Sequence, residues 1–328
     1  MNKKPIDYAP IFEEFVDEEL SAWPLAAQNY DYLNKITDNR QTIESFDEKI
    51  GERPWYIEKL LCSHRKASLS AKVDQKSLSE RPCFLCKANR PEEQGAIEWE
   101  NYEILLNPYP IGDPHFTIAS KLHEPQRIAG RIKDMARLAR MMPWCCVFYN
   151  GPLCGASAPD HLHFQATEQM LCANTWTPKK NLTQVIRLGK STLYAPTPSN
   201  SLFPYFIIDS ASDRDLSEIF DIVYNALPQA DPEPMMNVVA MKTEGRMSVA
   251  IIPRRRHRPS FYGTGPDEML ISPASAEMLG LFITSRQEDF DRLDLQTVRR
   301  IYDEVTLSPE EFSEVIDRIH HAVTPKTK

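Results

Sequence analysis

Two histidines and a glutamine alternate with apolar residues in HLHFQA, residues 161–166. Alternate side chains of a strand share one face, so we expect His161, His163 and Gln165 to point one way while the intervening residues face a core. A neutral imidazole attacks phosphorus near pH 7 and leaves readily from the resulting phosphoramidate. The pattern therefore indicates two-step phosphoryl or nucleotidyl transfer, with Gln165 donating a hydrogen bond to a phosphate oxygen. An edge strand with a solvated polar face would produce the same pattern.

A second group of candidate ligands lies upstream, where Cys83 and Cys86 form a Cys-x-x-Cys pair. Two thiolates at this spacing can chelate Zn²⁺, and a tetrahedral site needs two further ligands. His161 is a candidate for one place, and His123 and His115 compete for the other. A buried cysteine pair or a redox dithiol is the alternative. No thioredoxin-like βαβ pattern surrounds the pair, which disfavours redox chemistry.

A basic cluster, PRRRHRP at residues 253–259, contains four arginines in five consecutive positions. In an extended chain Arg254, Arg256 and Arg258 share a face, and the planar guanidinium group suits phosphate. We expect Arg254 and Arg256 to reach the phosphate groups of a nucleotide or a sugar phosphate. The alternative is a solvated patch that pairs with acidic side chains of the same chain.

The elements that must position these residues follow from hydrophobic periodicity. Their expected ranges are a helix at 13–36, strands at 102–107 and 115–120, a helix at 127–142, strands at 144–150 and 161–167, a strand at 205–210, a helix at 213–227 and a hairpin of strands at 237–242 and 248–253. The order helix–strand–turn–strand thus occurs twice, at 127–167 and at 213–253, which predicts an internal duplication. Ser308, Pro309 and Glu311 resemble a capping box at the start of a C-terminal helix.

The composition is that of a soluble globular protein, large enough for two domains or one duplicated domain. The 328 residues carry a formal net charge of -8, which argues against a general nucleic-acid or membrane-surface binder. The first residues contain no apolar signal segment, and no stretch approaches the ~20 apolar residues of a membrane span. The chain has seven cysteines, and an odd number does not indicate a disulfide framework. We therefore expect a cytoplasmic protein.

Taken together, these motifs resemble the histidine-triad superfamily, most of all the branch with galactose-1-phosphate uridylyltransferase, dinucleoside tetraphosphate phosphorylase and GDP-sugar phosphorylases. The resemblance is carried by CFLC at 83–86, NPYPIGDPHFTIASKLH at 107–123 and YNGPLCGASAPDHLHFQA at 149–166. HLHFQA is closest to the GDP-sugar phosphorylase version, whereas the uridylyltransferases read HPH.

The resemblance implies an α+β fold of two triad-like halves, with a mainly antiparallel sheet, helices packed on it, and helical N- and C-terminal segments. The expected divisions are an N-terminal helical segment at 1–80, a half with the active-site motif at 81–200, and a second half with C-terminal helices at 201–328.

The resemblance also assigns roles to single residues. His163 corresponds to the covalent nucleophile and Gln165 to the phosphate-binding amide. The implied zinc ligands are Cys83, Cys86, His123 and His161, because SKLH fits the third place and favours His123 over His115. The implied substrate-binding residues are Asn107, near the ribose, Asn150 and Ser157. The glycine and serine of GASAPD lie one residue farther from His161 than in several relatives, which weakens the assignment of Ser157.

The implied activity is that of a nucleotidyltransferase or phosphorylase with a ping-pong mechanism. His163 takes a nucleoside monophosphate from a nucleoside-diphosphate sugar or a related nucleotide and passes it to phosphate or a sugar phosphate, with a structural Zn²⁺ nearby. The alternatives are a dinucleoside polyphosphate hydrolase, a nucleotide-binding zinc protein without turnover, and histidines that are catalytic metal ligands. No nucleic-acid or membrane partner is expected, and related proteins commonly form homodimers.

Overall fold

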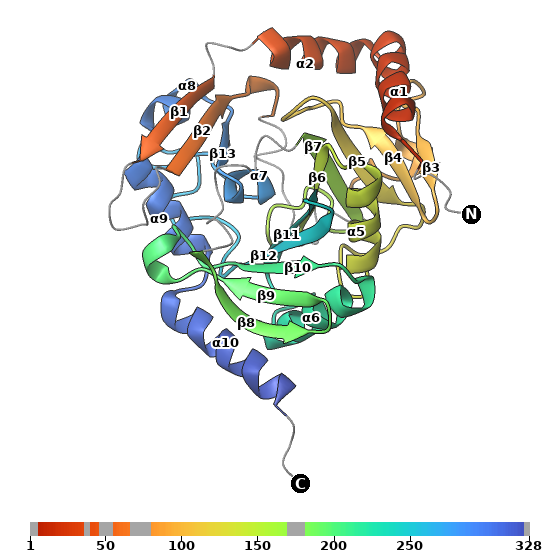
Figure 1. Cartoon of the computed structure of the whole chain (residues 1–328). Helices are drawn as coiled ribbons and strands as arrows, with labels where there is room; N and C mark the ends of the chain where they lie inside the picture. Colours follow the sequence, from red (N-terminus) through yellow and green to blue (C-terminus); the bar gives the residue numbers. More distant parts are fainter. Residues whose placement is uncertain (1–5, 36–39, 46–54, 66–79, 169–180, 325–328) are drawn as a thin grey trace, which may run out of the picture.

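The structure is a computed structural model that describes residues 6–35, 40–45, 55–65, 80–168 and 181–324. The fold is α+β, as the resemblance implies, with one large sheet, one small sheet and helices on both sides of the large one (Figure 1). No helix in these ranges is long and apolar enough to span a bilayer.

The large sheet has ten strands, and every neighbouring pair in it is antiparallel. In chain order they are β3 (Ile97–Trp99), β4 (Tyr102–Leu106), β5 (His115–Ser120), β6 (Cys145–Asn150), β7 (His163–Glu168), β8 (Thr183–Leu188), β9 (Ser191–Ala195), β10 (Phe206–Ser210), β11 (Met236–Thr243) and β12 (Arg246–Pro253).

The spatial order of these strands is symmetric about the β6–β11 pair. Outward from the centre, β6-β7-β5-β4-β3 on one side corresponds to β11-β12-β10-β9-β8 on the other. Helix α5 (Ile132–Met141) lies between β5 and β6 in the chain, and α6 (Asp213–Ala226) lies between β10 and β11. This symmetry is what a duplicated strand–helix–strand–strand unit produces, because each copy pairs its own strands before it meets the other.

The helices on one face of the large sheet follow the predicted pattern with small shifts. α5 begins at Ile132 rather than at 127, because Gly130 has a φ of +75° that is not helical. The N-cap of α6 is Ser212, whose hydroxyl accepts from the backbone N–H of Asp215. Helix α10 (Pro309–Val323) begins with the predicted capping box of Ser308 and Glu311. Apolar residues of α5, α6 and α10 form one core with alternate strand residues.

The N-terminal segment differs from the single helix predicted at 13–36. Two helices, α1 (Ala9–Ala22) and α2 (Pro24–Lys35), meet at Pro24, whose ring nitrogen has no hydrogen to continue the ladder. Strands β1 (Arg40–Ser45) and β2 (Trp55–Leu61) follow, although residues 1–80 were expected to be helical. β2 pairs in parallel with β13 (Leu281–Thr284), which is far away in the sequence.

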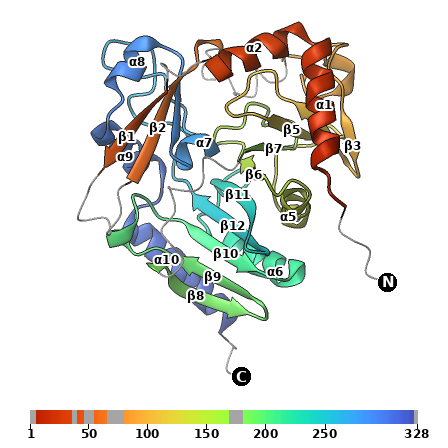
Figure 2. The same cartoon turned by 45° about the horizontal axis from the view of Figure 1, so that its top comes forward.

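A second layer covers the opposite face of the large sheet (Figure 2). It contains the small sheet of β1, β2 and β13 and the helices α7 (Ser275–Met278), α8 (Gln287–Arg292) and α9 (Leu295–Val305). Residues of β6 alternate between the two layers: Val147 and Tyr149 belong to the core with α5, whereas Cys146 and Phe148 pack against the second layer. The candidate site lies on this second face.

Candidate active site

A cavity of about 690 Å³ lies on the second face of the large sheet, beside β7. Five of the predicted site residues line it: His163, Gln165, Asn107, Asn150 and Ser157. Further lining residues come from other places in the chain, among them the α1–α2 junction, the loop after Cys83, the 3-10 helix η1 (Ser63–Arg65), β4, α7 and β13. The cavity therefore depends on segments that are far apart in the chain, from Trp23 to Ile283.

His163 is the first residue of β7 and only 2 % exposed. Its Nδ1 lies 2.8 Å from the backbone carbonyl oxygen of His161. A carbonyl oxygen can only accept, so Nδ1 carries the ring proton and Nε2 keeps the lone pair of the neutral imidazole. Burial lowers the pKa of His163 to about 4. The ring on the cavity wall is thus uncharged and has a defined tautomer, with the lone pair on Nε2.

Gln126 fixes the backbone of His163 at the point where β6 and β7 separate. Its amide nitrogen donates to the carbonyl oxygens of Asn150 and His163 at 2.9 and 3.0 Å, and its amide oxygen accepts from the N–H of His163 at 2.8 Å. Gln126 is fully buried. Sequence reasoning missed it, because a single glutamine between a strand and a helix has no motif that marks it.

Gln165 is oriented by His115. The Nε2 of His115 lies 3.0 Å from the amide oxygen of Gln165, so this nitrogen carries a proton and donates it. The amide NH₂ of Gln165 then remains for a ligand in the cavity. His115 is fully buried beside Gln165, so it is not a metal ligand together with Cys83 and Cys86, and His123 remains the candidate for that position.

Asn107 and Asn150 both line the cavity, but their side chains form hydrogen bonds with different parts of the structure. Asn107 donates to the Thr117 hydroxyl at 3.0 Å and accepts from the N–H of Tyr109 at 2.9 Å, which shapes the turn after β4. The amide oxygen of Asn150 accepts from Asn237 at 2.9 Å and from both the N–H and the hydroxyl of Ser275. Asn150 therefore joins the two halves of the large sheet to α7.

The basic cluster does not reach the cavity. Arg254 is 2 % exposed, and its guanidinium donates to Asn237 at 2.6 Å and to backbone carbonyls that include that of Val305. Arg256 is exposed and donates to Glu304 at 3.2 Å. Because β12 ends at Pro253, the arginines are not an extended face of that strand. Arg254 supports Asn150 through Asn237, and the geometry gives neither arginine a place beside a ligand.

The loop between β6 and β7 approaches α7 closely at Gly155. Its φ is +96°, and a Cβ there would lie 2.4 Å from that of Ala274, so only glycine fits. Ser157 lies farther along the same loop, and its carbonyl accepts from Arg81, which also pairs with Asp160 at 3.1 Å. The small residues of this loop let its backbone form part of the cavity wall.

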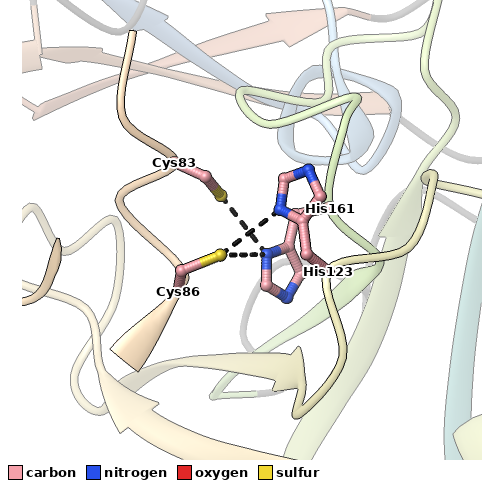
Figure 3. Close-up of side chains that lie close together, drawn as sticks. All are labelled: Cys83, Cys86, His123 and His161. Atoms are coloured by element: carbon pink, nitrogen blue, oxygen red, sulfur yellow. Dashed lines mark hydrogen bonds between the residues drawn. The ribbon is translucent and has the colours of Figure 1, made fainter. Parts of the chain in front are cut away.

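The predicted metal ligands converge on one another (Figure 3), and Phe84 and Leu85, which lie between the two cysteines in the sequence, line the cavity. One ligand atom of each of Cys83, Cys86, His123 and His161 lies within 4.8 Å of all the others. The Sγ of Cys83 is 3.3 Å from His161 Nδ1, and the Sγ of Cys86 is 3.3 Å from His123 Nδ1. These separations fit a tetrahedron with Zn–S bonds near 2.3 Å and Zn–N bonds near 2.0 Å.

The surroundings of the cluster prepare its members for a cation. The Nε2 of His161 donates to the Ser120 carbonyl at 2.8 Å, so its Nδ1 keeps the lone pair that a metal needs. Burial raises the pKa of the Cys83 thiol, but hydrogen bonds from the backbone N–H groups of Leu85 and Cys86 act to lower it, which favours the thiolate that binds a metal. His161 precedes β7 and does not line the cavity, so it does not share the cavity-facing position expected for the three polar residues.

Comparison with known proteins supports the fold. Two family models match: "Domain of unknown function (DUF4922)" over residues 15–168 and "GDPGP1-like, C-terminal domain" over residues 205–326. No curated protein matches the sequence. Yeast Ap4A phosphorylase Apa2 in complex with Ap4A has a TM-score of 0.53 at 14 % identity, covering 87 % of this chain and 97 % of that chain. Its complex with AMP has a TM-score of 0.51 at 14 % identity, covering 88 % and 97 %.

A solved uridylyltransferase has 16 % identity and a TM-score of 0.41, covering 87 % of this chain and 100 % of that chain, which is too low to carry an argument. At these identities the likeness to the yeast enzyme shows the fold alone. The α+β fold that the resemblance implies is thereby confirmed, with Ap4A phosphorylase as a solved protein of similar fold.

Proposed function

We propose that this chain, which has the fold of the phosphorylases in the histidine-triad superfamily, is a nucleotidyltransferase of the phosphorylase type. It transfers a nucleoside monophosphate from a nucleoside-diphosphate sugar or a related nucleotide to phosphate or a sugar phosphate. The observation that carries the proposal is the His163 ring on the cavity wall, with Nδ1 held by the His161 carbonyl and Nε2 left as the nucleophile.

In the first step, Nε2 of His163 attacks the α-phosphorus, and the bond from that phosphorus to the bridging oxygen breaks. The electron pair leaves with the phosphate-bearing product. The imidazole of the adduct is cationic, and the hydrogen bond from Nδ1–H to the His161 carbonyl stabilises that charge. The NH₂ of Gln165 donates to a non-bridging oxygen of the α-phosphate, in the orientation that His115 sets.

In the second step, an oxygen of phosphate or of a sugar phosphate attacks the same phosphorus, and the P–N bond breaks. His163 returns to its neutral form with the proton still on Nδ1. Two inversions at phosphorus give overall retention of configuration. Water as the acceptor would turn the same chemistry into hydrolysis.

Cys83, Cys86, His123 and His161 would hold a Zn²⁺ in this proposal. The ion would supply a structural cross-link between the turn at Cys83 and Cys86, the loop after β5 and the segment before β7. That cross-link fixes His161, and the carbonyl of His161 holds the nucleophile. The residues of the chain itself carry out every chemical step.

The cavity has a part suited to a nucleoside. Apolar side chains from the α1–α2 junction, the cysteine loop and β4 line it, among them Trp23, Phe84, Leu85 and Leu105. Aromatic and aliphatic walls with a few polar groups are typical of nucleotide pockets. The complexes of the yeast relative with Ap4A and AMP support a nucleotide as the substrate here.

The experiment is a screen of nucleoside-diphosphate sugars and dinucleotides for turnover that depends on phosphate, followed by mass analysis for a nucleotidyl adduct. His163→Ala should form no adduct, whereas the matched control His321→Ala, an exposed histidine of α10, should behave as the wild type. Product without phosphate would identify a hydrolase. Nucleotide binding without any adduct in the wild type would identify a non-catalytic protein, and full activity of His163→Ala would refute the assignment.

A further inference from the structure

A second wall of the cavity comes from η1 and α7 and carries Arg65 and Glu277. The guanidinium of Arg65 donates through Nη1 to the Tyr109 carbonyl at 2.5 Å. Its Nε is buried and has no hydrogen-bond partner within the described ranges. Buried donors are nearly always satisfied in folded proteins, so an unpaired guanidinium N–H on a cavity wall indicates an acceptor supplied by a ligand.

Arg65 lies near the reacting residues. It interacts electrostatically with His115, whose Nε2 holds the amide of Gln165. Gln165 in turn is two residues along β7 from His163. The other cavity arginine, Arg81, is neutralised by Asp160. Among the parts of the chain that the structure describes, no carboxylate lies within ion-pair distance of Arg65.

Glu277, the carboxylic acid on the same wall, is held by backbone donors rather than by a hydrogen bond to Arg65. Its carboxylate accepts from the backbone N–H groups of Ala274 and Ile283, at 2.8 and 3.3 Å. Burial raises the pKa of Glu277 to about 7, and the nearby Arg65 acts against this rise. The backbone donors thus hold the carboxylate of Glu277, and the guanidinium of Arg65 remains available to an anion in the cavity.

We propose that Arg65 binds the phosphate group that leaves in the first half-reaction and attacks in the second, either inorganic phosphate or the phosphate of a sugar phosphate. This inference rests on the proposed function. One site serves both roles, because the acceptor oxygen must approach phosphorus from the position that the leaving oxygen vacated. A planar guanidinium can donate two parallel hydrogen bonds to phosphate oxygens, which fixes the attacking oxygen in line with the P–N bond.

The two half-reactions of the full-length protein separate this subsite from the nucleophile. A nucleoside 5′-phosphorimidazolide donates the nucleotidyl group but releases imidazole, which has no phosphate for Arg65 to hold. Arg65→Gln should therefore form the His163 adduct at the wild-type rate from this donor. Its discharge by inorganic phosphate should be about 10- to 100-fold slower than in the wild type, as for a lost charge-assisted hydrogen bond. Discharge by water should be unchanged.

The control Arg140→Gln removes the same charge from the exposed pair with Asp213 on the α5–α6 side, and should match the wild type. Inorganic phosphate should raise the melting temperature of wild type and control but not that of Arg65→Gln. Should Arg65→Gln not fold, Arg65→Lys replaces it, with a raised KM for phosphate expected. Wild-type discharge in the folded variant overturns the Arg65 assignment alone, whereas the absence of any wild-type adduct overturns the proposed function.

Discussion

Replacing His115 tests the neutral buried ring that orients Gln165. His115→Gln can place an amide nitrogen close to the position of the ring Nε2, so it keeps the hydrogen bond to Gln165 and removes the titrating group. His115→Phe keeps an aromatic ring beside Phe148 but loses the donor. The pair of variants separates the cost of burying a basic group from the value of the hydrogen bond.

The expected pH effect follows from the pKa of His115. Burial, and next the nearby Arg65, lowers this pKa from 6.5 to about 3. Below pH 6.5 the unfolded chain therefore binds a proton that the folded chain does not, so this residue costs stability as the pH falls. At pH 5, about 1.5 units below the unfolded pKa, the cost is about 2 kcal/mol at roughly 1.4 kcal/mol per unit.

Urea unfolding at pH 7.5 and pH 5 measures this effect. The free energy of unfolding of the wild type should fall by about 2 kcal/mol more than that of either variant between the two pH values. Identical pH dependence in all three proteins would show that His115 is not buried as a neutral ring.

Single-turnover adduct formation at pH 7.5 measures the second role of His115. His115→Gln should stay close to the wild type, and His115→Phe should be about 10- to 100-fold slower, because the amide of Gln165 is then free to turn. An adduct rate for His115→Phe equal to that of the wild type would refute the orienting role.

Two further perturbations test the supports of the site. Cys86→Ser, or a chelator added to the wild type, should abolish tight binding of about one zinc ion and lower the melting temperature by about 5 °C or more; a wild type that is purified without metal and is unaffected by chelator would contradict this. Gly155→Ala should cost roughly 2–4 kcal/mol, because it combines a left-handed backbone with a steric clash. The control Gly245→Ala has a φ of +78° but open space around it, so about 1 kcal/mol is expected. Equal losses in urea unfolding would show that the contact of Gly155 with α7 is unimportant.

Local sequence patterns predicted much of the large sheet and of its helices. Strands β4 to β7 and β10 to β12 lie close to their expected ranges, because alternation with a period of two is a property of neighbouring residues. Ser308 caps its helix as expected for the same reason. The resemblance, and not the spacing, implied that four ligands converge: Cys83, Cys86, His123 and His161. The spacing alone did not distinguish His115 from His123 as the third ligand.

What the sequence by itself determined is the set of groups able to do chemistry and the order of the elements that carry them. Only the tertiary structure placed Arg65 on the cavity wall, paired β2 with β13, enclosed Gln126 between two strands and buried Arg254 away from the cavity. These features depend on contacts between segments that are distant in the chain. Such contacts leave no periodic signal, because a guanidinium or an amide has the same local sequence whether its partner is water, a backbone carbonyl or a ligand.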